Sequence, residues 1–541
     1  MTSPATRPEI STSSGSVRRT YGAAAGLRDL FALLGDLLID GGDSRLALDR
    51  PWGRNAYGCG PSPAPDLLCF ASSTASPISE RAYARAELAR EQLMHAAISL
   101  GLDEALDRRT EEMRCELRQH LGLTEAVDIV FSPSGTDSQL HALALVRALF
   151  GESVTSVVVG SDQTGSGTPA TARGRHFSAR TAGGRAVTRD APIEGLSSEA
   201  IFLPLFDGVS MRVRGEIDAA VLETVGALVR DGRNVLLQIM DASKLGWRAP
   251  DMACLDEVAR RWPGRVQVVV DACQMRLGPG RLRSHLDRGH LVAVTGSKFY
   301  GGPAFSGALL VPATLSPALR KGGPMAAGLF DYVNRSDWPM AWTDLRARAV
   351  PRANIGQWLR WEAALEEITA YRVVPEAFRR MAIRQLGEAI ESLLALSPVL
   401  RPIATHAVAD ADDGEFGFAT IFPFVLRRDG RLLDLGETQA VNRALQHDLG
   451  SHFSGRTAAV AARQCLIGQP VRIERGDAPP AGALRLCIGA RQVTEAWSDD
   501  ITTARVNLES EIDRIADVVA KTELLVSDLS SQDLRDICNA N

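Results

Sequence analysis

The sequence has few of the features that mark secreted, membrane-bound or nucleic-acid-binding proteins. Its 541 residues include 8 cysteines and no Cys-x-x-Cys pair, which argues against a disulfide scaffold or a zinc site and favours a reducing compartment. No uncharged apolar run approaches the length that spans a bilayer, and a net charge of -5 gives no reason to expect nucleic acid. We therefore expect a cytoplasmic protein that binds a small molecule, with no metal, membrane or nucleic-acid partner.

What the sequence does have is a repeated pattern of short apolar runs, each followed by a turn that contains glycine or serine. The runs are apolar at most positions, which is typical of strands buried on both faces in a parallel sheet between helices. The pattern predicts an α/β fold. The predicted strands cover residues 127–131, 154–159, 235–240, 266–270, 291–294 and 308–311.

The length allows a large domain with a smaller companion. In the second half, long helices are predicted within residues 357–395, strands near 419–426 and 484–488, and an amphipathic helix over 506–525. This mixture of long helices and separate strands predicts a smaller α+β domain. The expected divisions are a flexible tail (1–20), a helical segment that packs on both domains (21–110), a large α/β domain (111–350) and a small domain (351–541).

Polar residues follow several predicted strands, at the edge where open parallel sheets bind ligands. Ser134, Gly135 and Thr136 come after the first strand and open a helix. Small residues at a helix start expose backbone N–H groups and the positive end of the helix dipole, which suits a phosphate. An ordinary helix cap is the alternative interpretation.

Asp271 directly follows three valines of another predicted strand. A carboxylate at a buried strand end needs a partner, and the protonated ring nitrogen of pyridoxal phosphate (PLP) is one. A helix cap or an ordinary ion pair is equally compatible with this position.

Lys298 follows the next strand and precedes a glycine-rich turn. Because apolar surroundings disfavour its charged form, a lysine there is a nucleophile toward an aldehyde. The alternative, a solvated surface lysine, fits poorly with such apolar and glycine-rich neighbours.

These motifs resemble a known family. The run Asp271-Ala272-Cys273-Gln274, followed by Lys298 in Thr-Gly-Ser-Lys-Phe-Tyr-Gly-Gly-Pro, is similar to the core of fold-type I PLP enzymes of the class V aminotransferase and cysteine desulfurase superfamily. The resemblance covers roughly residues 70 to 525 and implies the fold and the cofactor of that superfamily.

The resemblance also implies roles for individual residues. Lys298 would form the internal aldimine, a Schiff base, Asp271 would pair with the pyridinium nitrogen, and Gln274 would bond the phenolic oxygen. Gly135, Thr136, Thr295 and Ser297 would hold the phosphate, and Ser134 and Gln163 are also expected to bind the cofactor. Ser297 stands where the superfamily usually has histidine, and the ring-stacking histidine is replaced near Gln163, so what stacks on the ring stays open.

The substrate side of the site is expected in two segments. Residues 241–250, which include Ser243, are similar to a family segment near the cofactor oxygen and the substrate. Arg485 resembles the small-domain arginine that binds the substrate α-carboxylate, and a guanidinium fork suits that group. A surface arginine on a strand is the alternative.

The predicted function is that of a PLP-dependent transferase or lyase, which acts on an amino acid through an external aldimine and a quinonoid in a specialised biosynthetic pathway. One alternative is annulation of S-adenosylmethionine with a nicotinamide dinucleotide. Another is a cysteine desulfurase that uses Cys465, although a cysteine among Leu and Ile is more often core. A non-catalytic α/β binding protein is the contrasting class, but the Gly-x-Gly at 165–167 is an incomplete dinucleotide motif.

The resemblance implies a homodimer with shared active sites. Residues 329–339 and the arginines near Pro351 have the aromatic-rich and arginine-rich composition of an interface core. Arg352 is expected to reach a neighbour's site, and a loop folded on its own subunit is the alternative.

Overall fold

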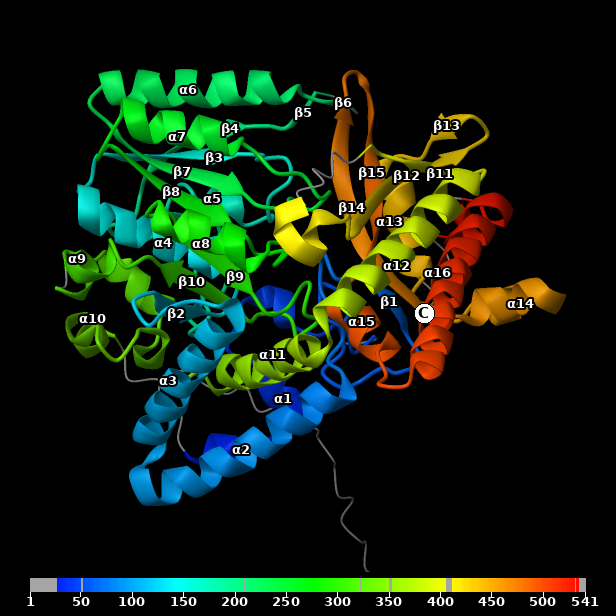
Figure 1. Ribbon diagram of the computed structural model, residues 1–541, viewed down its shortest axis with the longest axis horizontal. Coiled ribbons are helices and arrows are strands. Elements are labelled where there is room, and N and C mark those ends of the chain that lie inside the picture. Colours follow the sequence, from blue (N-terminus) through cyan, green and yellow to red (C-terminus); the bar gives the residue numbers. More distant parts are fainter. Residues whose placement is uncertain are drawn as a thin grey trace, which may run out of the picture.

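A computed structural model describes residues 27–49, 52–207, 210–321, 323–349, 353–404, 411–530 and 532–534. The chain is organised around two large sheets that lie side by side (Figure 1). The seven-stranded sheet has the order β2-β10-β9-β8-β7-β3-β4, and the six-stranded sheet has the order β1-β14-β15-β12-β11 with β13 beside β12. The predicted tail, residues 1–20, lies outside the described residues.

The seven-stranded sheet is mainly parallel. All neighbouring pairs from β9 to β4 are parallel, whereas β10 runs antiparallel to both β9 and β2. The six predicted strands and the α/β class are confirmed; β4 was missed because it is a partly exposed edge strand without a fully apolar run. The strands are β2 (Asp128–Ser132), β3 (Val154–Val159), β4 (Glu199–Leu203), β7 (Asn234–Met240), β8 (Val266–Asp271), β9 (Leu291–Thr295) and β10 (Gly307–Val311).

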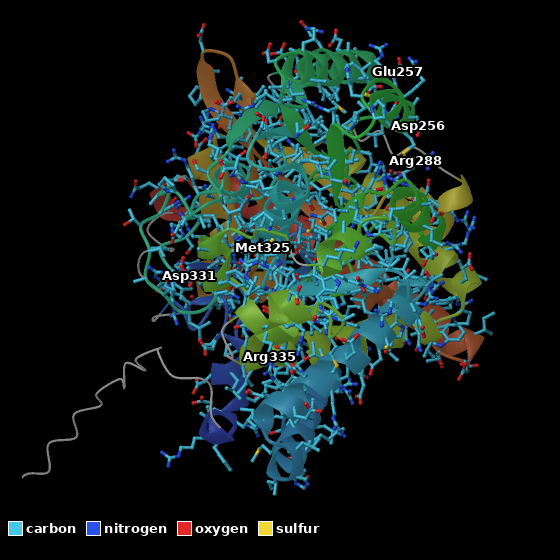
Figure 2. The ribbon with its side chains drawn as sticks, turned by 90° about the vertical axis from the view of Figure 1, so that its left-hand side faces the viewer. Asp256, Glu257, Arg288, Met325, Asp331 and Arg335 are labelled. Carbon is cyan, nitrogen blue, oxygen red and sulfur yellow. The ribbon has the colours of Figure 1, made fainter. Side chains whose placement is uncertain are left out.

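Helices cover both faces of this sheet, and α4 crosses it next to the strands that carry the predicted site. Leu140 and Leu143 of α4 pack with Val130 and Leu309 of the sheet in one buried cluster. On the surface, Arg288 after α8 pairs with Asp256 of α7 at 2.9 Å, which ties these two helices together (Figure 2). The helices are α4 (Gly135–Phe150), α6 (Arg214–Arg230), α7 (Met252–Arg261) and α8 (Pro279–Asp287).

The six-stranded sheet is antiparallel except where β1 joins β14 in parallel. Helices α12 (Glu376–Leu396) and α16 (Ile501–Asp528) pack on it, and α11 (Ile355–Val373) packs on α2 (Glu80–Leu100) and α3 (Leu102–Leu121). The long helices and the amphipathic helix predicted for the second half are therefore present; the domain boundaries stay a prediction. The strands are β1 (Leu68–Phe70), β11 (Leu400–Pro402), β12 (Ile421–Arg428), β13 (Arg431–Leu432), β14 (Cys465–Arg475) and β15 (Ala478–Cys487).

The aromatic stretch after residue 329 folds onto its own subunit. Tyr332 and Trp338 are buried in the cluster that also contains the core of α4, and Arg335 pairs with Asp107 of α3 at 2.8 Å. An intramolecular core and a subunit interface have similar compositions, so the composition of this stretch did not distinguish them. The composition of residues 329–339 is therefore no evidence for a subunit interface. The homodimer itself stays a prediction.

None of the helices in the described ranges is both long and apolar enough to cross a bilayer. Within the same ranges, no three His, Cys, Asp or Glu side chains gather as ligands for a metal ion.

Candidate active site

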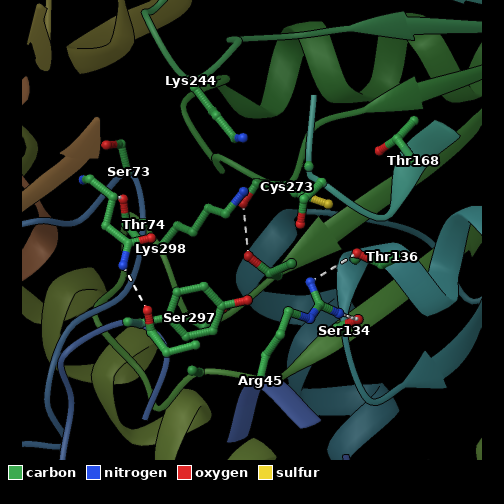
Figure 3. Close-up of a pocket in the computed structure, with 18 of the residues that line it drawn as sticks. Arg45, Ser73, Thr74, Ser134, Thr136, Thr168, Lys244, Cys273, Ser297 and Lys298 are labelled. Atoms are coloured by element: carbon green, nitrogen blue, oxygen red, sulfur yellow. Dashed lines mark hydrogen bonds between the residues drawn. The ribbon is translucent and has the colours of Figure 1, made fainter. Parts of the chain in front are cut away.

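A cavity of about 360 Å³ lies where the carboxyl ends of β8 and β9 meet the start of α4 and the six-stranded sheet (Figure 3). Residues from distant parts of the chain line it together. Eight of the residues predicted from the sequence are among them: Ser134, Gly135, Thr136, Asp271, Thr295, Ser297, Lys298 and Arg485.

Lys298 lies in a tight turn directly after β9. The turn is closed by hydrogen bonds from Gly296 N–H to the Ser306 carbonyl at 2.9 Å and from Gly301 N–H to the Lys298 carbonyl at 2.9 Å. Helix α11 packs closely against this turn: a Cβ on Gly296 would lie 2.5 Å from the Ala364 side chain. Gly296 is therefore needed for the close approach that holds the lysine backbone at the cavity wall.

Asp271 ends β8 and is held by two donors. Gln139 Nε2 of α4 donates to Asp271 Oδ2 at 3.0 Å, and the backbone N–H of Cys273 donates to Oδ1 at 3.1 Å. Thr171 Oγ1 donates to Gln139 Oε1 at 3.2 Å, which fixes the orientation of that amide. Each carboxylate oxygen retains acceptor capacity toward the cavity.

The start of α4 forms a polar cradle with Arg45. Ser134 caps the helix, so the first backbone N–H groups, on Gly135 and Thr136, have no partner within it. Arg45 Nη2 donates to Ser134 Oγ and Nη1 to Thr136 Oγ1, both at 3.3 Å. Asp43 pairs with the guanidinium at 2.5 Å and keeps it aimed at the helix start.

A buried carboxyl group lies behind this cradle. Ser134 Oγ donates to Asp137 Oδ2 at 2.5 Å. Burial, with a smaller contribution from Asp43, raises the pKa of Asp137 to about 7. The carboxyl group is therefore easily protonated in the cofactor-free protein.

Arg485 reaches the cavity from β15 with an exposed fraction of only 1%. Its Nε donates to Ser73 Oγ at 3.2 Å and its Nη2 to Thr74 Oγ1 at 2.9 Å, while Nη1 donates to the Gln469 carbonyl. A guanidinium has five N–H groups, so two remain beyond these bonds. The alternative of a surface arginine is wrong for this position.

Three predicted site residues, Gln163, Gln274 and Ser243, are not among the described residues that line the cavity. Gln163 is buried and does not line the cavity, whereas Gly165, Ser166 and Thr168, which follow it in the chain, do. Gln274 Nε2 donates to the Ser73 carbonyl at 3.0 Å. Ser243 Oγ accepts from the Trp247 N–H at 3.0 Å and shapes its own turn. Arg352 lies outside the described residues.

Several residues that line the cavity had no role in the sequence analysis. Arg45 and Tyr57 come from an irregular N-terminal segment with no local motif, so no sequence signal could have found them. Lys244 could have been predicted, because it lies next to Ser243 in residues 241–250, which were expected near the cofactor and the substrate. Burial, followed by the charges of Arg485 and Lys298, lowers the pKa of Lys244 to about 7.

No family model matches the sequence, and no curated protein does. Solved structures do resemble the fold. A NifS-like protein is 13% identical, with 83% of this chain and 99% of that chain covered and a TM-score of 0.46. The cystine C-S lyase C-DES, solved with cysteine persulfide, is 16% identical with 83% and 97% covered and a TM-score of 0.46. SPT with a PLP internal aldimine is 12% identical with 83% and 87% covered and a TM-score of 0.44.

Proposed function

We propose that this chain is a PLP-dependent enzyme that acts on an amino-acid substrate. The observation that carries the proposal is that Lys298 and Asp271 line one cavity with the start of α4. An amine for an aldehyde, a carboxylate for a ring nitrogen and donors for a phosphate are thus available in one ligand-sized space.

The residues present fit the cofactor. The Thr136 hydroxyl, the Arg45 guanidinium and the free backbone N–H groups of Gly135 and Thr136 converge at the start of α4, and together they are a donor set that suits a phosphate. Gly135 lines the cavity and has no room for a side chain, since an added Cβ would lie 2.5 Å from Cys273 Sγ.

When bound, the cofactor supplies an aldehyde that condenses with amines and a ring that accepts electrons. Lys298 would hold the cofactor covalently and then carry protons to and from the substrate Cα. Asp271, fixed by Gln139, would keep a proton on the ring nitrogen. Arg485 would orient the substrate α-carboxylate through its remaining N–H groups.

The reaction type we propose is transamination or lyase chemistry in a specialised biosynthetic pathway. A desulfurase that uses Cys465 is less well supported, because that cysteine is fully buried in β14 and burial raises the pKa of its thiol to about 11. A mobile, reactive thiolate needs the opposite environment.

A second candidate, a reaction that joins two substrates such as S-adenosylmethionine and a nicotinamide dinucleotide, is favoured by one observation. A cavity of about 540 Å³ shares Ala56, Gln469 and Pro470 with the first, and Trp52 and His447 also line it. A planar second substrate bound there should quench Trp52 fluorescence, and Trp52→Phe should abolish that part of the change. Absence of quenching by nicotinamide dinucleotides would remove this candidate.

The central proposal is tested by borohydride reduction followed by peptide mass spectrometry. We expect cofactor label on Lys298 and none in Lys298→Ala, because that variant has no amine at this position. Lys244→Met is the matched control, since it removes another lysine of the same cavity and should keep the label. Label at equal yield in Lys298→Ala, or no label in the wild-type protein supplied with PLP, would contradict the proposal.

A further inference from the structure

Lys244 is the cation of this cavity to which the proposed function gives no role. It follows β7 and lines the cavity, and its amine extends toward that of Lys298 (Figure 3). In the described part of the chain the Lys244 side chain forms no hydrogen bond or ion pair, whereas Arg45 and Arg485 are both hydrogen-bonded. A buried or partly buried cation without a partner is costly unless a ligand supplies one.

The charges around Lys244 are unbalanced. Four cations line the cavity, Arg45, Lys244, Lys298 and Arg485; Asp43 pairs with Arg45, and Asp271 is the one carboxylate among the described residues that line the cavity itself. Arg485, Lys298 and Arg45 all disfavour the charged form of Lys244, and Asp271 alone among the charged neighbours favours it. An anion bound near Lys244 would therefore stabilise the ammonium form and gain affinity in return.

The proposed ligands account for the other charges. The phosphate of the cofactor uses Arg45 and the start of α4, the ring nitrogen uses Asp271, and the cofactor aldehyde uses Lys298. The α-carboxylate of an amino acid uses Arg485. One cation, Lys244, remains without a ligand group.

Building on the proposed function, we propose that Lys244 binds a second acidic group of the substrate, so that the substrate is an amino acid with a carboxylate side chain. In this arrangement Arg485 and Lys244 hold the two carboxylates separately. The pairing also selects against neutral amino acids, because these leave Lys244 without a partner.

The test compares ligands of equal length with and without the second acid. Dissociation constants of L-glutamate and L-norvaline are measured by calorimetry on the purified holoenzyme, in the wild-type protein and in Lys244→Met and Lys244→Arg. Losing one partner of a desolvated charge pair should weaken L-glutamate by about 30-fold in Lys244→Met, while L-norvaline changes by less than about twofold. Lys244→Arg keeps the charge and should retain most of the preference.

Three results would overturn the inference. Equal weakening of both ligands would show that Lys244 shares the α-carboxylate with Arg485. Unchanged binding with loss of turnover would make Lys244 a proton carrier, and a wild-type protein that does not prefer L-glutamate would have no second acid site. Melting temperatures of the variants show that each one is folded.

Glutarate and valerate separate this inference from the proposed function, because neither has an amine to react with a cofactor. If glutarate binds more tightly than valerate only when Lys244 is present, the acid site exists even if borohydride places no label on Lys298. If Lys298 is labelled but glutarate shows no dependence on Lys244, the inference fails and the proposed function stands.

Discussion

Gly135 lies directly against Cys273: a Cβ added to the glycine would be 2.5 Å from the cysteine Sγ and 3.5 Å from its Cβ. The contact joins the first residue of α4 to the segment that follows β8. The close contact requires a residue without a Cβ at position 135. It holds the proposed phosphate cradle at a fixed position relative to the carboxylate of Asp271.

The Gly135→Ala substitution should therefore displace the start of α4 and weaken binding of PLP. Gly135→Ala combined with Cys273→Ala should recover most of the loss, because the two Cβ atoms would then be 3.5 Å apart, an ordinary contact. Equilibrium titration of the cofactor into the two single variants and the double variant measures the coupling. Additive losses would show that the steric contact is not the cause.

Asp271→Asn should preserve the hydrogen-bonding shape but remove the charge that holds a proton on the cofactor ring. We expect turnover to fall by about 100-fold or more while the cofactor content falls modestly. Gln139→Leu removes only the donor to Oδ2, so it should cost less. Steady-state kinetics with cofactor content measured in parallel checks both, and full turnover in Asp271→Asn would refute the role.

Arg45→Ala should reduce affinity for the cofactor phosphate by about tenfold or more, since a charge-assisted contact is lost. Arg54→Ala is the control, because Arg54 belongs to the same segment but lines the neighbouring cavity instead. Inorganic phosphate should compete for the wild-type site more strongly than for the Arg45→Ala site. Equal affinities of the two variants for PLP would exclude Arg45 from the cradle.

The raised pKa of Asp137 gives the cofactor-free protein a defined pH dependence. The folded protein holds this proton up to about pH 7, whereas the unfolded chain loses it near the ordinary carboxyl pKa of about 4. The contribution to stability is therefore complete below pH 4, declines as the pH rises, and is lost above 7. The decline is at most about 1.4 kcal/mol per pH unit. Asp137→Asn should remove this decline in urea unfolding measured across that range.

Mixing variants, at a PLP concentration too low to load Arg45→Ala, tests how the proposed homodimer shares its sites. Arg45 and Lys298 line the same cavity within one chain, so mixed dimers of Arg45→Ala and Lys298→Ala should regain no activity. Mixed dimers of Arg352→Ala and Lys298→Ala should regain one complete site if Arg352 comes from the partner. Rescue in the first mixture would show that the N-terminal segment crosses between subunits, and no rescue in the second would leave Arg352 out of the site.

The sequence predicted the buried strands of the larger sheet because an apolar run directly reports burial on both faces. It also predicted that Asp271 and Lys298 converge, because neighbouring parallel strands end at the same edge. It did not predict Arg45, whose position depends on how an irregular segment closes over the sheet. Nor did it predict the orientation of the Gln274 side-chain amide. This amide donates to the Ser73 carbonyl and accepts from the Arg276 guanidinium.

The parallel pairing of β1 with β14 has a consequence for biosynthesis of the protein. Leu68 can pair with Cys465 only after most of the chain has been synthesised, and Arg485 is synthesised later than Cys465. The nascent chain can therefore form the seven-stranded sheet well before β14 and β15, which line the other side of the cavity, have been synthesised. We therefore expect the cavity to be completed, and any cofactor to be retained, only after β14 and β15 have been synthesised, and β1 to remain unpaired until then.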